Sequence, residues 1–233
     1  MDIDPVQSLL FYAVFLLAVT LHEAAHAWAA YRLGDATAYH GGQVTLDPRP
    51  HIRREPFGMV LLPLISLVTI GWPFGFASAP YDPRWAMRHP RRAAWMALAG
   101  PASNLLLCLV SGLIILALLG AGVFVGPESV RFAHLVDSSS GGAWDAAGFL
   151  LSAMFSLNLL LAVFNLLPFP PLDGSGAVPL LLNDKQTVRY QQAIWGNPGI
   201  AWIGILIAWY AFDFFFDPIW TLAINILLPG SYG

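Results

Sequence analysis

Long apolar runs separated by polar, arginine-rich connections dominate this chain. A membrane-spanning helix needs about 20 apolar residues, and four runs are long enough: residues 6–31, 93–120, 146–168 and 198–216. A shorter apolar segment, Phe57–Ile70, is interrupted by Pro63 and followed by glycine and proline, which is typical of a re-entrant or interfacial segment. The pattern predicts an all-α polytopic membrane protein with about four transmembrane helices.

Two segments interrupt the helical pattern. Between Tyr39 and Pro48, β-prone residues lie between turn signals, which is compatible with a short membrane-associated β-hairpin and equally with an ordinary ordered loop. Near the C-terminus, Pro218 follows Asp217, and a proline inside a helix removes a hydrogen bond and clashes with the preceding turn. We therefore expect the last spanning helix to end there, with residues 219–228 along the outer interface.

Composition agrees with a membrane protein. Hydrophobic residues make up 57% of the chain and charged residues only 11%, whereas soluble domains carry about 25% charged residues. The 233 residues suit a single transmembrane domain, 1–233, whose surroundings are the lipid bilayer. The net charge of −3 argues against a nucleic-acid partner.

The basic residues predict the orientation, because short cytoplasmic loops carry the excess of lysine and arginine. Ten of the eleven basic residues would lie on one face if residues 57–76 do not cross the membrane. Eight lie between the first two predicted spans and two between the last two: Arg32, Arg49, Arg53, Arg54, Arg84, Arg88, Arg91, Arg92, Lys185 and Arg189. We expect a multi-pass protein of the cell membrane with both termini outside.

The first apolar run contains a candidate metal site. Its only charged or metal-binding side chains between residues 6 and 30 are His22, Glu23 and His26. Histidines four residues apart share one face of a helix, which is the spacing with which two imidazoles bind one zinc ion while the intervening glutamate acts as the base. Ionisable residues at membrane depth are costly and usually functional.

A catalytic zinc site typically has three protein ligands and one open position. The predicted topology brings Asp173, which follows the third span in a Pro/Gly-rich segment, to the side where the two histidines lie. We expect Asp173 to be the third ligand, in a water-accessible cavity toward the cytoplasmic face. The competing candidates lie in basic, polar loops and are better explained as surface histidines: His40, His51 and His89.

Two asparagines are further candidates for the catalytic site. Asn104 in the second span and Asn165 at the end of the third are expected at the same depth. A neutral amide can hydrogen-bond the developing oxyanion or a substrate backbone, and it can equally form an interhelical hydrogen bond. Both interpretations remain open for each residue.

These motifs together resemble the site-2 protease family of intramembrane zinc metalloproteases. The resemblance rests on four stretches in the family's order: His22-Glu23-Ala24-Ala25-His26, Gly100-Pro101-Ala102-Ser103-Asn104, Asn165-Leu166-Leu167-Pro168 and Leu172-Asp173-Gly174. The loop 121–145 is too short for the PDZ domain of some members, and we expect the compact form, without PDZ or CBS domains.

The resemblance implies one zinc ion per chain, bound by His22, His26 and Asp173, with Glu23 activating water. It also implies that Asn104 lies near the active-site cleft, and that the stretches 40–50 and 71–81 guard substrate access. The expected function is cleavage of peptide bonds in or near transmembrane segments of other membrane proteins.

Two other functions compete with this one. A binding or chaperone protein of the same fold would be expected to lack a zinc ligand or the base, and all are present. A metal transporter would be expected to carry several intramembrane clusters of ionisable residues, and only one occurs.

Overall fold

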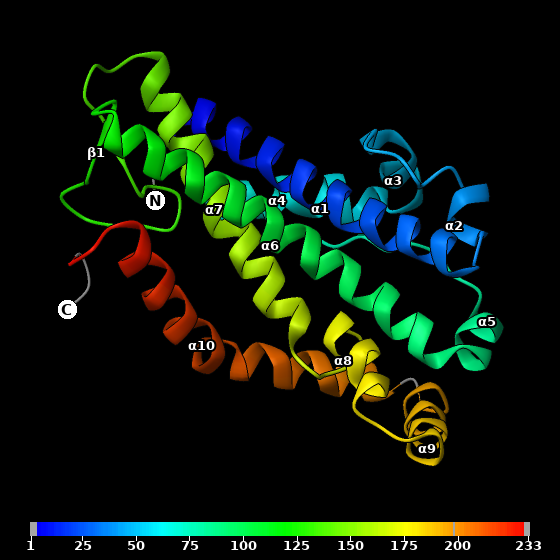
Figure 1. Ribbon diagram of the computed structural model, residues 1–233. Coiled ribbons are helices and arrows are strands. Elements are labelled where there is room, and N and C mark those ends of the chain that lie inside the picture. The colour runs from blue at the N-terminus through cyan, green and yellow to red at the C-terminus, as the bar shows by residue number, and fades with distance from the viewer. Residues whose placement is uncertain (1–3, 198, 231–233) are drawn as a thin grey trace.

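The computed structural model describes residues 4–197 and 199–230, so the ends of the expected domain 1–233 lie outside the described residues. Four helices among these residues are long and apolar enough to span a membrane: α1 (Pro5–Leu33), α6 (Pro90–Gly120), α7 (Ala143–Leu166) and α10 (Gly199–Leu227). Successive long helices run in opposite directions (Figure 1). The predicted class, an all-α polytopic membrane protein, is confirmed.

The ends of α1 show why the helix covers these residues. Pro5 occupies the first turn, where no backbone N–H is needed, and the Asp4 side chain accepts a hydrogen bond from the Val6 N–H at 3.4 Å. At the other end, Gly34 adopts φ 106°, a left-handed conformation that glycine tolerates best. The helix is therefore 29 residues long and contains both histidines of the candidate metal site.

Short elements connect α1 to α6: the helices α2 (Thr37–His40) and α3 (Pro48–Arg54), a π-helical turn η1 (Phe57–Leu61) that continues into α4 (Leu62–Ile70), and α5 (Pro83–Arg88). Helices α3 and α5 lie at the same end of the molecule (Figure 1). The segment between them thus leaves and returns to one end, as a re-entrant segment does. The 14 residues of η1 and α4 are too few for a full span.

The strand considered between Tyr39 and Pro48 does not form, because this stretch contains helix α2 and a series of bends. Backbone hydrogen bonds from Gly41 to Thr37 and from Gln43 to Ala38 close these turns locally. The two-stranded antiparallel sheet in the described residues lies elsewhere, where β1 (Phe124–Val125) pairs with β2 (Asp137–Ser138).

The chain turns back sharply after α7. Helix α8 (Asp173–Ala177), a 3-10 turn η2 (Val178–Leu180) and helix α9 (Asp184–Trp195) follow at the end of the molecule that also carries α2 and α5 (Figure 1). Helix α9 begins with a capping box in which Asn183 and Gln186 bond each other's backbone N–H groups. The Tyr190 hydroxyl donates to the Ser175 carbonyl at 2.7 Å, so α9 holds α8 in place.

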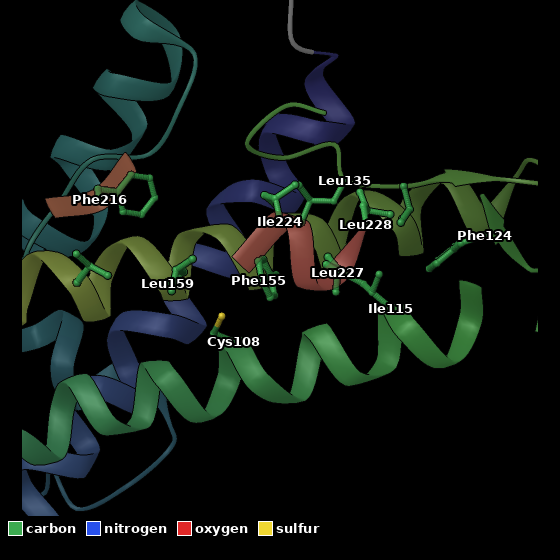
Figure 2. Packing of buried hydrophobic residues seen from close by; sticks show 12 residues of the cluster. Cys108, Ile115, Phe124, Leu135, Phe155, Leu159, Phe216, Ile224, Leu227 and Leu228 are labelled. Atoms are coloured by element: carbon green, nitrogen blue, oxygen red, sulfur yellow. The ribbon is translucent and has the colours of Figure 1, made fainter. Parts of the chain in front are cut away.

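The last helix differs from the prediction. Helix α10 continues through Pro218 to Leu227 instead of ending at Asp217. Ile224 is fully buried and Leu227 nearly so, and Figure 2 shows both beside Phe155 of α7 and Ile115 of α6. Residues 219–228 therefore contribute to the hydrophobic core, and this packing offsets the hydrogen bond that proline removes.

Candidate metal centre

Helix α1 presents three buried ionisable side chains at one level: His22, Glu23 and His26 are 5–8% exposed. The two imidazoles lie on one face, with ring centroids 4.7 Å apart. The carboxylate of Glu23 forms no hydrogen bond within the described part of the chain. The helix thus supplies two possible metal ligands and a buried carboxylate without a hydrogen-bonding partner among the described residues.

Asp173 reaches the histidines because the chain folds back after α7. The segment from Leu167 to Leu172 contains three prolines and is followed directly by Asp173, the first residue of α8. A Cβ atom on Gly174 would collide with the backbone carbonyl of Leu166, so only glycine permits this close return. The fold-back places the Asp173 carboxylate at the level of His22 and His26.

The three side chains form the metal-compatible group found among the described residues. The Nε2 atoms of His22 and His26 are 3.0 Å apart, and they lie 3.0 and 3.2 Å from Asp173 Oδ2. Ligands bonded to a tetrahedral zinc ion at 2.0–2.2 Å are separated from one another by about 3.3–3.6 Å. The observed separations agree within a few tenths of an ångström.

The hydrogen bonds around the imidazoles also fit a cation. His26 Nδ1 lies 2.8 Å from the Met96 carbonyl, which can only accept, so this nitrogen carries the proton. His22 Nδ1 lies 2.5 Å from Asn104 Oδ1. Both Nε2 atoms then direct lone pairs toward a carboxylate oxygen. Three converging acceptors repel one another unless a cation lies among them, and two nitrogens with one oxygen suit zinc.

Gly100 allows α6 to approach this group. A Cβ atom on Gly100 would overlap the Nε2 atoms of both His22 and His26. The glycine of the Gly100–Asn104 motif therefore provides the space in which the imidazoles lie.

The structure places the two candidate asparagines differently. Asn104 is fully buried, and its amide contacts His22 on one side and Asn158 Oδ1, at 2.8 Å, on the other. Asn165 is half-buried and donates to the Leu161 carbonyl of its own helix at 2.9 Å. Within the described residues no hydrogen bond links Asn165 to the metal-compatible group.

Asn158 was missed by the sequence analysis. It is fully buried in α7, seven residues before Asn165. The one signal available was its type, a polar amide in an apolar helix, and that signal does not distinguish it from Asn104 or Asn165.

The competing histidines do not join the group in the described part of the chain. His40 and His89 are exposed as expected. His51 is not a surface residue: it is 2% exposed, and its Nε2 lies 3.2 Å from the Thr45 carbonyl. The expectation for His51 was wrong because helix α3, which contains His51, packs against α1.

The stretch after α4 is extended and runs beside the re-entrant segment. The Phe74 N–H donates to Ser66 Oγ at 2.7 Å, and the Phe76 N–H donates to the Gly58 carbonyl at 3.1 Å. The ring of Phe74 meets Trp209 of α10 edge-to-face at 6.1 Å. This stretch therefore contacts both α4 and α10. It contains residues 71–81, which were expected to guard substrate access.

The fold is that of a multi-pass helical membrane protein with a group that could bind a metal ion. Comparison with known proteins identifies the family. The family model described as peptidase family M50 matches residues 10–205. The chain therefore belongs to peptidase family M50, the site-2 protease family, and the resemblance seen in the sequence is confirmed.

Similar proteins carry consistent names. A Bacillus subtilis protein named "Putative zinc metalloprotease YwhC" is 36% identical over 80% of this chain and 76% of its own length. A Mycolicibacterium smegmatis protein named "Putative zinc metalloprotease Rip2" is 31% identical over 91% of this chain and 78% of its own. No solved structure matches the chain. Family and relatives together support a zinc metalloprotease.

Proposed function

We propose that this protein is an intramembrane zinc endopeptidase that cleaves transmembrane segments of other membrane proteins. The observation that carries the proposal is the convergence of His22, His26 and Asp173 on one point inside the helical bundle. These three residues would hold one zinc ion per chain. Bound zinc would supply Lewis-acid polarisation of the scissile carbonyl and of water.

Glu23 is the proposed general base. It is 5% exposed, lies between the two histidines in the sequence and has no hydrogen-bonding partner among the described residues. A carboxylate in this position can take the proton from an attacking water and deliver it to the leaving amine nitrogen. Asn165 remains a proposed contact for substrate or oxyanion. For Asn104, whose amide is engaged on both sides, we favour a role through His22.

Access to the proposed site is expected from the side of Asp173. The carboxylate side chain is 22% exposed, whereas the side chains of His22 and His26 are 9% and 10% exposed. In the orientation that the arginines predict, this opening faces the cytoplasm. A substrate helix must unwind there, because its carbonyl groups are already hydrogen-bonded within the helix.

The test uses the purified chain in lipid nanodiscs, with zinc measured by mass spectrometry. The substrates are two single-span peptides that differ only by an Asn-Pro or a Leu-Leu pair at mid-membrane. We expect one zinc per wild-type chain and faster cleavage of the Asn-Pro peptide. Glu23→Gln should retain zinc and lose activity by about 10²-fold or more, whereas Asp173→Ala should lose zinc.

Equal cleavage by wild type and Glu23→Gln would refute the assignment of the base. Zinc retained by Asp173→Ala would refute its role as a ligand. A zinc-loaded wild type that binds the peptides without cleaving them would replace the proposal by a binding protein of the same fold.

A further inference from the structure

A chain of hydrogen bonds leads from His22 into the protein interior. His22 Nδ1 contacts Asn104 Oδ1 at 2.5 Å, and Asn104 Nδ2 donates to Asn158 Oδ1 at 2.8 Å. Asn158 Nδ2 in turn donates to the Met154 carbonyl at 2.8 Å. Both asparagines are fully buried, so water cannot replace any partner along this chain.

Backbone carbonyl groups determine the direction of these hydrogen bonds. The Met154 carbonyl can only accept, so the Asn158 atom facing it must be the amide nitrogen. The Asn158 oxygen then faces Asn104 and requires the Asn104 nitrogen as its donor. That nitrogen also lies 3.5 Å from a second carbonyl, that of Ala18. The Asn104 oxygen is left facing His22.

An oxygen that faces His22 Nδ1 accepts a hydrogen bond only if that nitrogen carries the proton. The neutral ring then keeps its lone pair on Nε2, the atom that faces His26 and Asp173. If the Asn104 amide rotated by half a turn, its NH₂ group would face Nδ1. The proton would then move to Nε2, which could no longer bind a metal.

We propose that Asn158 is a positioning residue that holds the Asn104 amide in one orientation and thereby fixes the metal-binding tautomer of His22. The inference rests on the proposed zinc site, because it concerns the nitrogen that would face the ion. It differs from a packing role in one respect: what matters at residue 158 is an acceptor directed at Asn104. A side chain of similar shape without that acceptor leaves the Asn104 nitrogen with the longer contact, 3.5 Å, to the Ala18 carbonyl, so the amide is held less firmly in its present orientation.

The experiment measures the zinc dissociation constant of the full chain in nanodiscs by competition with a chelator, together with the visible spectrum of the Co²⁺-loaded protein. Asn158→Leu should weaken zinc binding about 10-fold, as loss of a group that orients a ligand typically does, and should alter the Co²⁺ spectrum. In Asn158→Asp a protonated carboxyl group can donate its hydroxyl to the Met154 carbonyl and keep an accepting oxygen toward Asn104, so this variant should stay within about 3-fold of wild type. Ser156→Ala is the matched control: it removes a buried hydroxyl two residues away that has no hydrogen-bonding partner among the described residues, and it should change neither.

A double variant separates the effect of the Asn104 amide orientation from the effect of packing at residue 158. A carboxylate presents an acceptor to His22 whichever way it is turned, so Asn104→Asp should abolish the effect of Asn158→Leu on zinc affinity. Melting of the metal-free proteins shows which variants fold. If Asn158→Leu does not fold, the zinc affinity of Asn158→Asp tests the proposal.

Three outcomes would overturn the inference: wild-type zinc affinity in folded Asn158→Leu, an equal loss in folded Asn158→Asp, or an unchanged loss in the double variant. A wild-type protein that binds no zinc would instead refute the proposed metal site itself.

Discussion

Gly100→Ala is the smallest change that should disturb the proposed metal site. The added methyl group would overlap the Nε2 atoms of His22 and His26. Neither ring can move away freely, because His22 Nδ1 is bonded to Asn104 and His26 Nδ1 to the Met96 carbonyl. Either the imidazoles turn out of these hydrogen bonds, or α6 moves away from α1.

The magnitude follows from the cost of one extra methyl group in a packed interior, typically 1–3 kcal/mol. Without zinc, the rings can rotate to relieve part of this strain, whereas zinc would require both Nε2 atoms in their present positions. The strain should therefore appear mainly as lost zinc affinity. Since about 1.4 kcal/mol corresponds to a factor of ten, we expect zinc binding to weaken by about 5- to 150-fold.

The assay compares zinc dissociation constants of wild type, Gly100→Ala and Gly120→Ala by chelator competition. Gly120 ends the same helix, and a Cβ atom there would meet no atom of the described residues within 4 Å. Gly120→Ala should leave zinc affinity unchanged, which controls for the change of residue type. Wild-type zinc affinity in Gly100→Ala would show that the imidazoles do not occupy the positions on which the proposed site depends.

Two further predictions concern parts of the fold outside the site. Ile224→Ala should destabilise the protein by about 2–5 kcal/mol, because Ile224 is fully buried beyond Pro218. Leu222→Ala changes a side chain that is 62% exposed and should leave the melting temperature nearly unchanged. Equal effects of the two substitutions on the melting temperature would contradict the packing of α10. Hydrogen bonds from the Arg49 side chain and backbone lower the pKa of Asp47 to about 2. The stability that the ionised Asp47 carboxylate gives to the folded state should therefore be lost as the pH falls from about 4 toward 2. The difference in melting temperature between wild type and Asp47→Ala should shrink over that pH interval. A constant difference would contradict a stabilising interaction between ionised Asp47 and Arg49.

The long helices could be predicted from the sequence because their cause is local. A run of about 20 apolar residues must satisfy its own backbone in lipid, and a helix does so without help from distant residues. The predicted starts and ends of α1, α6 and α7 accordingly fall within about three residues of the observed ones. Pro218 was misjudged by the same local argument, since the contacts that carry α10 past it come from α6 and α7.

The candidate site shows the same division. The pattern His22-Glu23-x-x-His26 indicated a metal site because helical periodicity alone puts both imidazoles on one face. The inclusion of Asp173 depended on a topology inferred from arginines, and the structure shows the close contact itself. Asn158 and Met96 could not be found in this way, because their contacts depend on how closely α7 and α6 approach their neighbours.

By itself, the sequence determined the class of the protein, its four long helices and the chemical types of the groups that could bind zinc. These follow from hydrophobic length, helical periodicity and residue chemistry, which act over a few neighbouring residues. Only the tertiary structure decided which polar groups meet: the fold-back at Gly174 that brings in Asp173, the space at Gly100, and the hydrogen bonds from Met154 to His22. Residues far apart in the chain come into contact only through helix packing, and the pattern along any one helix does not specify its partners.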